Sequence, residues 1–205
     1  MLTYDIKKDR KDLYAPRQTD FSLVDVPALA FLMVDGHGDP NTEAAYRDAV
    51  EALYAVSYAV RALAKTRLGR VHTVAPLEGL WSAKDMEVFR AREKGAWDWT
   101  MMIAQPDWIT TEMVEQAAAA AQKKRLPALG LVRFEEYAEG RSAQILHVGS
   151  YDDEGPTLAR LHDEFLPANG LVPSGRHHEI YLSDPRKTDP ARLKTILRQP
   201  VTPPP

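Results

Sequence analysis

The segment RHHEIYLSDP, residues 176–185, has the pattern of a β-strand that ends at an Asp-Pro pair. Side chains alternate between the two faces of a strand. One face would carry His178, Ile180 and Leu182, and the other His177, Glu179 and Tyr181. A strand with one apolar face usually packs that face against helices. We therefore expect the Glu179 face to be free to line a cleft.

The composition excludes several classes of protein. The 205 residues fit one domain or two small ones, and the charges that sum to −3 are scattered along the chain. They form no basic stripe of the kind that nucleic-acid binders carry. The chain has no cysteine, which excludes disulfides, thiolate metal sites and thiol nucleophiles. Neither a signal peptide nor a membrane-spanning apolar run is recognisable, so we expect a cytoplasmic protein without membrane partners.

The first half of the chain alternates predicted strands and helices. Residues 21–34 form one bent strand or two short strands divided at Pro27, because proline donates no ladder hydrogen bond. A helix follows Asp39 and Pro40, which suit the cap and the first helical position. The other predicted elements are an N-terminal arm (1–20), strands at 71–81 and 97–104, a charged exposed segment (84–94) and a helix from Thr110 or Thr111 to Lys124.

The second half opens with a predicted hairpin. Its strands are residues 129–137 and 142–148, and the short loop between them contains Gly140. A helix is expected from about Pro156 to the Asn-Gly pair at 169–170, where glycine suits a helix end. After the strand at 176–185, Asp189 and Pro190 predict the start of a last helix, and residues 201–205 a disordered tail.

Two segments of the chain follow the same plan. Residues 99–106 and 178–185 both read as strands that end in a proline, and a strand, a turn and a helix precede each of them. We therefore predict an α+β fold in which two pseudo-symmetric strand–helix–strand–strand modules surround a central ligand groove. The chain would be a single domain, residues 1–205, with repeats at about 21–125 and 129–200.

Aligning these two segments transfers the prediction of faces from one repeat to the other. In this alignment Thr100 corresponds to Glu179 and Met102 to Tyr181, so they would lie on the equivalent face of their strand. The predicted groove therefore carries a carboxylate on one side and none at the matching place on the other. This asymmetry fits a polarised ligand better than a symmetric structural role.

Several motifs resemble those of the GyrI-like small-molecule-binding proteins, in particular the stand-alone subfamily related to cyclopropanoid cyclopropyl hydrolases. Residues 178–186, followed by 193–201, resemble the C-terminal signature of the family. Residues 31–40 are similar to the first-strand motif of the stand-alone members. Shorter matches lie at 76–81, 99–103 and 147–152, so that the resemblance covers about residues 1–201.

The resemblance implies two strand–helix–strand–strand modules around one ligand groove. In this family a glutamate in the groove, at the position of Glu179, faces aromatic side chains and receives bulky, planar or cationic organic molecules. Some stand-alone members hydrolyse the cyclopropane of DNA-alkylating cyclopropanoid drugs in an aromatic cage. Others are effector domains fused to helix-turn-helix regions. This chain has no room for such a region before Phe21, so we expect no direct nucleic-acid binding.

Glu179 and Tyr181 are the catalytic candidates. An ionised carboxylate pairs with a cationic ligand, to which each aromatic face adds about 0.5–2 kcal/mol of cation–π attraction. A partly desolvated carboxylate can also act as a general acid or base near neutral pH. In a ring-opening hydrolysis, Glu179 would orient the attacking water and Tyr181 would hydrogen-bond the leaving carbonyl.

Five further side chains are candidate ligand contacts: Trp81, Trp99, Met102, Tyr137 and Tyr151. The position of Trp81 at the end of a strand favours the pocket. Alternation places Trp99 with the core residues, while the family motif keeps it among the candidates. For the tyrosines, Tyr181 included, the sequence leaves pocket lining and ordinary packing both open, because amphipathic aromatics suit both.

The remaining motifs indicate neither a metal nor a cofactor. His177 and His178 point to opposite faces of a strand and cannot readily chelate one ion. Gly36-His37-Gly38 lacks the lysine of a phosphate loop and the glycine spacing of a dinucleotide site. The sequence leaves open a non-catalytic sensor or sequestering protein, a gyrase-interacting protein, and any oligomeric state.

Overall fold

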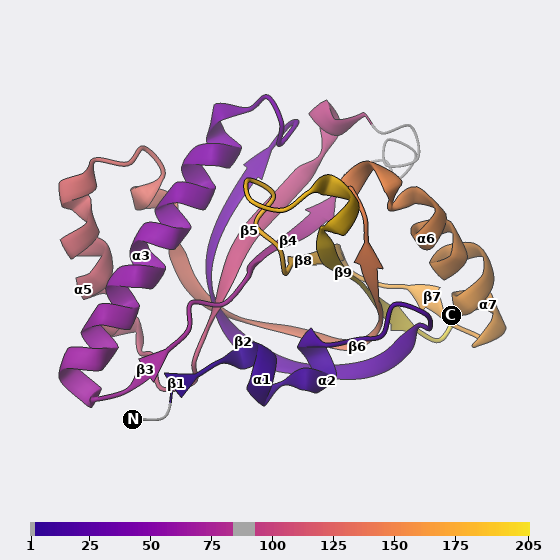
Figure 1. Ribbon diagram of the computed structural model, residues 1–205, viewed down its shortest axis with the longest axis horizontal. Coiled ribbons are helices and arrows are strands. Elements are labelled where there is room, and N and C mark those ends of the chain that lie inside the picture. The colour runs from indigo at the N-terminus through magenta and orange to yellow at the C-terminus, as the bar shows by residue number, and fades with distance from the viewer. Residues whose placement is uncertain (1–2, 84–92) are drawn as a thin grey trace. The chain divides into compact units, whose positions relative to one another are not determined.

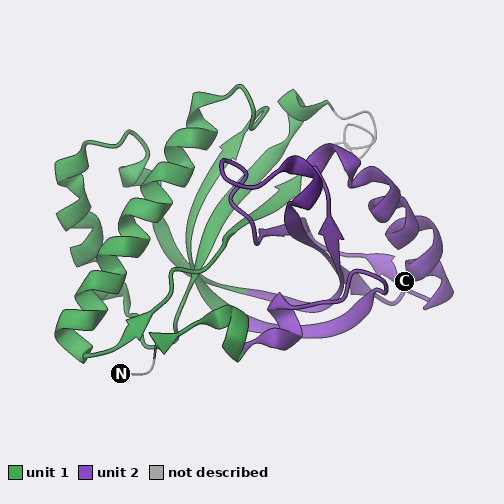
Figure 2. Ribbon diagram, viewed as in Figure 1, with its two compact units in different colours: residues 1–9, 29–137 green, residues 10–28, 138–205 purple. Residues whose placement is uncertain are grey.

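A computed structural model describes residues 3–83 and 93–205, and it is α+β (Figure 1). The chain divides into two compact units (Figure 2). Unit 1 comprises residues 1–9 and 29–137, and unit 2 comprises residues 10–28 and 138–205. Two long strands, β2 (Ser22–His37) and β6 (Arg133–Val148), run through both units. Most of the charged segment predicted at 84–94 lies outside the described residues.

Unit 1 is built on three antiparallel strands in the order β2–β5–β4. Strand β5 (Asp98–Gln105) is central and pairs with both β2 and β4 (Leu77–Ser82). Helices α3 (Ala44–Leu68) and α5 (Thr111–Ala121) run beside each other (Figure 1). A short parallel pair joins β1 (Thr3–Tyr4) to β3 (Val71–His72), and α1 (Ile6–Asp9) lies between them in the sequence.

The helices of unit 1 begin and end where local chemistry allows. Thr110 caps α5, because its hydroxyl accepts a hydrogen bond from the Met113 amide at 3.3 Å. Helix α3 ends at Gly69, whose φ of 62° is left-handed and suits glycine. It begins at Ala44, later than Asp39 and Pro40 predict. The described part of unit 1 also contains three short 3₁₀ turns: η1 (Lys94–Ala96), η2 (Gln122–Lys124) and η3 (Leu129–Leu131).

Unit 2 is also antiparallel, and β9 (Lys194–Thr202) is its central strand. It pairs with β6 along one side and with β8 (His177–Tyr181) and the short β7 (Val172–Pro173). A helical segment connects β6 to β7. It consists of η4 (Tyr151–Asp153), α6 (Gly155–Ala159), a π-helical turn η5 (Arg160–Phe165) and α7 (Leu166–Ala168). Helix α2 (Lys11–Tyr14) and the turn η6 (Pro190–Arg192) complete the unit.

Three predictions about single elements were wrong, and one of them is the tail predicted at 201–205, because Val201 and Thr202 belong to strand β9 (Lys194–Thr202). No hairpin forms at residues 138–140, because Gly140, at φ 77°, lies inside the continuous strand β6. The last predicted helix is strand β9, and only η6 is helical there. All residues from 195 to 201 are buried, since β9 has strands on both sides. A strand buried on both faces has no alternating pattern, so its apolar spacing can imitate a helix. For residues 21–34 the sequence allowed either one bent strand or two short strands divided at Pro27. The structure has one continuous strand there, β2.

The alignment of residues 99–106 with 178–185 was also wrong. Unit 1 presents β2, α3, β4 and β5 in this order, and unit 2 presents β6, the helical segment, β8 and β9. Strand β8 is therefore third in its series, whereas β5 is fourth. The Gln-Pro pair at 105–106 accordingly matches Gln199 and Pro200 at the end of β9, not the proline at 185.

Candidate functional site

Glu179 is the centre of a polar cluster in unit 2. Its side chain is 16% exposed, and its Oε2 accepts a hydrogen bond from the Tyr181 hydroxyl at 2.7 Å. Both residues project from one face of β8, as their spacing predicts. The Tyr151 ring, from η4, meets the Tyr181 ring edge to face, with centroids 5.7 Å apart. A carboxylate thus lies beside two phenols in a largely desolvated setting.

Tyr151 remains a neutral phenol in this cluster. Burial raises the pKa of its hydroxyl to about 12, and the carboxylates of Glu179, Glu154 and Asp184 act in the same direction. The tyrosine therefore keeps its proton at neutral pH. It can donate a hydrogen bond to a ligand oxygen, and its ring can contact a flat or cationic ligand.

His177 completes the cluster. Its Nε2 lies 3.5 Å from Glu179 Oε1, on the side of the carboxylate that Tyr181 does not occupy. This separation is long for a hydrogen bond, and it would become an ion pair when the imidazole carries a proton. Within residues 3–83 and 93–205, neither ring nitrogen has a hydrogen-bond partner, and both are buried. The spacing i, i+2 places His177 on the Glu179 face, but the sequence alone offered no reason to assign it a role.

The faces of β8 differ from the sequence-based prediction, which placed helices on the Ile180 face. Glu179 shares its face of the sheet with Ala143 and Val201, which pack against Leu161 and Leu166 of the helical segment. The helical segment between β6 and β7 therefore covers the Glu179 face, whereas the short helix α2 contacts the opposite one. The reason is that both faces of this sheet are buried, so apolar alternation in β8 could not identify the helical side.

A buried charge network occupies the Ile180 face. Glu139 Oε2 accepts hydrogen bonds from His178 Nδ1 at 3.0 Å and from Arg198 at 3.2 Å, and each of these side chains is 1% exposed. Arg198 also donates to Gln144 Oε1 at 3.0 Å and to the Leu13 carbonyl at 2.6 Å. The network therefore ties the N-terminal segment of unit 2 to strands β6, β8 and β9.

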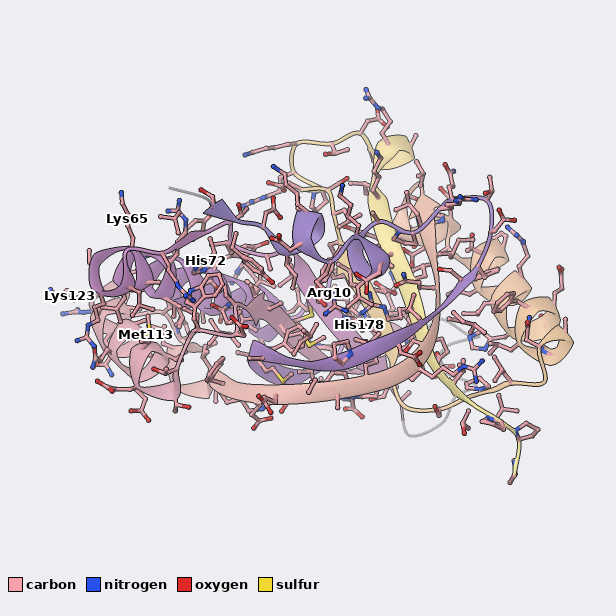
Figure 3. The ribbon with its side chains drawn as sticks, turned by 90° about the horizontal axis from the view of Figure 1, so that it is seen from below. Arg10, Lys65, His72, Met113, Lys123 and His178 are labelled. Carbon is pink, nitrogen blue, oxygen red and sulfur yellow. The ribbon has the colours of Figure 1, made fainter. Side chains whose placement is uncertain are left out.

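The charge state of this network follows from its contacts. Burial alone would raise the pKa of Glu139, but His178 and Arg198 outweigh it and hold that pKa below its ordinary value. Figure 3 places His178 among the interior side chains, whereas Lys65 and Lys123 point outward. Sequence reasoning missed the network, because Glu139 was assigned to a turn.

Unit 1 contains an aromatic cluster on the face of its sheet that α3 covers. Tyr46 of α3 meets Trp99 edge to face at 5.3 Å and stacks on Trp81 at 6.4 Å. Trp97 adds an edge contact to Trp81 at 5.6 Å. Trp81 and Trp99 are directly paired across β4 and β5, and they are 5% and 2% exposed. The two candidate tryptophans are therefore neighbours, and Trp99 has the core position that alternation predicts.

The Trp99 ring lies over Gly36, its partner on β2. A Cβ built on Gly36 would be 2.0 Å from the indole, far inside contact distance. Glycine is thus required by the close approach of the aromatic ring, and not by its φ angle. The first glycine of the GHG motif therefore has a packing role.

Met102 lies on the other face of the same sheet. It pairs with Met33 and Glu78, both buried like Met102 itself. On that face Asp35 accepts hydrogen bonds from Thr100 and from Arg133. Met102 is therefore separated from Trp81 and Trp99 by the thickness of the sheet.

Tyr137 lies on β6 in unit 1 and is half-buried. The structure thus brings together Glu179, Tyr181 and Tyr151 in one unit, and Trp81 with Trp99 in the other. That these groups contact one ligand stays a prediction. In the described part of the chain, no three or more His, Asp or Glu side chains are grouped to hold a metal ion. No helix there is both long and apolar enough to cross a bilayer.

Three solved structures are similar to this chain over nearly its whole length. All three are from Listeria innocua, and they each cover 98% of this chain and 100% of their own. One is an uncharacterized conserved protein with 40% sequence identity and a TM-score of 0.89. The other two are hydrolases, with 37% and 38% identity and TM-scores of 0.86 and 0.85. No curated protein matches the sequence.

A model of the GyrI-like small molecule binding domain matches residues 19–202, which is nearly all of the chain. The match includes both strands that run through the two units and the whole Glu179 cluster. This chain therefore belongs to the GyrI-like small-molecule binding domain family.

Proposed function

We propose that this protein binds a bulky planar or cationic hydrophobic molecule at Glu179 and opens the cyclopropane ring of cyclopropanoid DNA-alkylating compounds by hydrolysis. The observation that carries the proposal is the Glu179 cluster. A mostly buried carboxylate is positioned by one phenol and bordered by a second, neutral one. Such a site offers a negative charge, aromatic surface and hydrogen-bond donors within one small region.

The two-module organisation is part of this proposal. It is supported by the matching order of elements in the two units and by the Gln-Pro pairs near the C-terminal ends of β5 and β9. In this alignment Ile103 corresponds to Leu197. Their direct strand partners are Leu77 and Glu179, so a leucine stands where the second module has its carboxylate. The predicted asymmetry is thus retained, with Leu77 in place of Thr100.

The hydrolysis assigns one task to each side chain. Water forms a bond to an electrophilic cyclopropane carbon while the carbon–carbon bond breaks, and the released electron pair reaches the conjugated carbonyl oxygen. Glu179 accepts the proton of the attacking water, and a phenol, Tyr181 or Tyr151, donates a hydrogen bond to that oxygen. The oxygen then takes up a proton, so the product is the substrate plus one water. The two related hydrolases support this chemistry at the level of reaction type.

Binding without turnover is the second candidate, and one observation favours it. In the free protein the Tyr181 proton is directed at Glu179 Oε2, so this phenol is already engaged. A lipophilic cation would need only the carboxylate and the aromatic surface, whereas hydrolysis requires that a phenol turn toward the substrate carbonyl. The two functions therefore differ in what they require of Tyr181.

Turnover measured by mass spectrometry separates the two functions. The purified protein is incubated with a cyclopropanoid alkylator, and the expected product has gained one water and lost its alkylating reactivity. Glu179→Gln keeps the shape of the side chain and removes the base, so we expect loss of turnover. Glu164→Gln, an exposed carboxylate of the same unit, serves as the control and should match the wild type. Recovery of unaltered compound in stoichiometric complex would establish the binder instead. Equal binding and turnover by Glu179→Gln would refute the site.

A further inference from the structure

His177 is a buried titratable group that the proposed function leaves unused. Both of its ring nitrogens are buried and lack a hydrogen-bond partner within the described residues. A neutral imidazole presents one donor and one acceptor, and leaving both unsatisfied is unfavourable. Its nearest charged group is Glu179, whose Oε1 lies 3.5 Å from Nε2. Protonation of His177 would therefore place a positive charge directly beside the Glu179 carboxylate.

The two oxygens of Glu179 have different surroundings. Oε2 accepts the Tyr181 hydroxyl at 2.7 Å. In the part of the chain that the structure describes, His177 is the one basic side chain that pairs with Oε1. Oε1 is thus the oxygen that a cationic ligand would approach. An imidazolium at 3.5 Å would neutralise the same charge and become a donor at both nitrogens.

We propose that His177 is an internal competitor for Glu179: in its protonated form it pairs with the carboxylate and displaces cationic ligands. The inference rests on the proposed function, because it takes Glu179 as the anchor of the ligand. Its consequence is selectivity by charge and by pH. Permanently charged ligands are held at neutral pH and released in mild acid, since imidazole changes charge between about pH 5 and 8.

Other titratable or charged groups border the cluster within unit 2: Tyr181 on the same strand, Tyr151 in η4, Glu154 before α6, Asp184 after β8, His147 on β6 and Arg176 before β8. Two of these keep one charge state throughout the relevant range. Tyr151 has a pKa of about 12, and hydrogen bonding from Arg186 lowers the pKa of Asp184 to about 2. His147 is differently placed, because its Nε2 contacts the Ser150 carbonyl at 3.1 Å. His177 is thus the imidazole that contacts the ligand-facing oxygen.

The test uses tetraphenylphosphonium, an aromatic cation whose own charge does not depend on pH. Its affinity is measured by calorimetry at about pH 7.5 and pH 5.5 for the wild type, His177→Gln, His177→Asn and Glu179→Gln. We expect the wild-type Kd to rise at least about fivefold at the lower pH, the size expected when an imidazole becomes mostly protonated. In both His177 variants the ratio of the two Kd values should fall below about two. His37→Gln removes an exposed histidine that pairs with Asp98 at 2.8 Å in unit 1, and should keep the wild-type ratio.

Each outcome decides one question. A wild-type ratio retained in the His177 variants would overturn the inference, because protonation of Glu179 or His147 would then cause the effect. An unchanged affinity of Glu179→Gln at pH 7.5 would instead refute the proposed function. A measurement on the wild type alone tests the inference if the variants do not fold. Calorimetry near pH 6 in two buffers of different ionisation enthalpy reports how many protons are released when the cation binds. We expect proton release, and binding without it would also overturn the inference.

Discussion

Replacing Arg198 with methionine tests how the buried network holds unit 2 together. Arg198 is 1% exposed, and its guanidinium bonds Glu139, Gln144 and the Leu13 carbonyl. Methionine fills similar volume but leaves the Glu139 carboxylate, itself 1% exposed, paired with His178 and no longer with a guanidinium. Removing one partner from a buried ion pair costs about 3–5 kcal/mol, because the other charge stays desolvated.

Urea unfolding followed by circular dichroism at neutral pH measures this loss. For a chain of this size it corresponds to a fall in Tm of roughly 6–20 °C. The control, Arg192→Met, removes an exposed arginine from η6 and should stay within about 0.5 kcal/mol of the wild type.

A double variant tests whether the unpaired charge of Glu139 causes the loss of stability. Glu139→Gln removes the stranded charge, so adding it to Arg198→Met should recover at least about 1 kcal/mol relative to the sum of the single effects. The pKa of Glu139 is lowered in the folded protein, so its ionised form stabilises the fold above the ordinary carboxyl pKa. The stability difference between wild type and Glu139→Gln should therefore shrink as the pH falls below that value. A loss under about 1 kcal/mol for Arg198→Met, or strict additivity, would refute a strongly coupled network.

Three further predictions concern the other sites. Gly36→Ala forces a Cβ into the Trp99 ring and should destabilise the protein by about 1–3 kcal/mol in urea unfolding, whereas Gly130→Ala, with open space around it, should be nearly neutral. His72 is buried, and burial, followed by the nearby Arg61 charge, lowers its pKa to about 4, so its neutral form favours folding above about pH 6.5 and this contribution is lost as the pH falls toward 4. His72→Gln should flatten that part of the stability profile by on the order of 2–3 kcal/mol, and an unchanged profile would contradict the assignment. Tyr181→Phe removes the hydroxyl that holds Glu179, so tetraphenylphosphonium should bind within about threefold of the wild type while ring opening falls at least about tenfold. The control, Tyr58→Phe, changes an exposed tyrosine of unit 1 and should match the wild type in both measurements.

Local chemistry was enough to identify several features from the sequence. The α+β class, the long helices α3 and α5, the Thr110 cap and the strand at Glu179 follow from helical spacing, capping residues and alternation. The motifs that resemble the GyrI-like family extend over almost the same residues as the family match. The placement of Glu179 and Tyr181 on one face also needs only the period of a strand.

Other features depended on which strands become neighbours. Glu179 faces the helices because β8 pairs with β9, and β9 is buried on both faces, so no pattern within β8 marked the helical side. The alignment of 178–185 with 99–106 failed for the same reason, since strand order is a property of the sheet and a shift in alignment exchanges the faces.

Residue type and spacing along the chain were enough to identify the family, the fold class and the carboxylate with its tyrosine. The folded chain was needed to show that Glu139, His178 and Arg198 form one buried network, that Trp81 and Trp99 share the face that α3 covers, and that His177 lies against Glu179 Oε1. The buried network and the tryptophan pair depend on strand register, and the His177 contact depends on side-chain conformations that spacing along β8 does not fix. Those features arise from pairing between distant segments, and the strength of the charge interactions follows from the burial that this pairing creates.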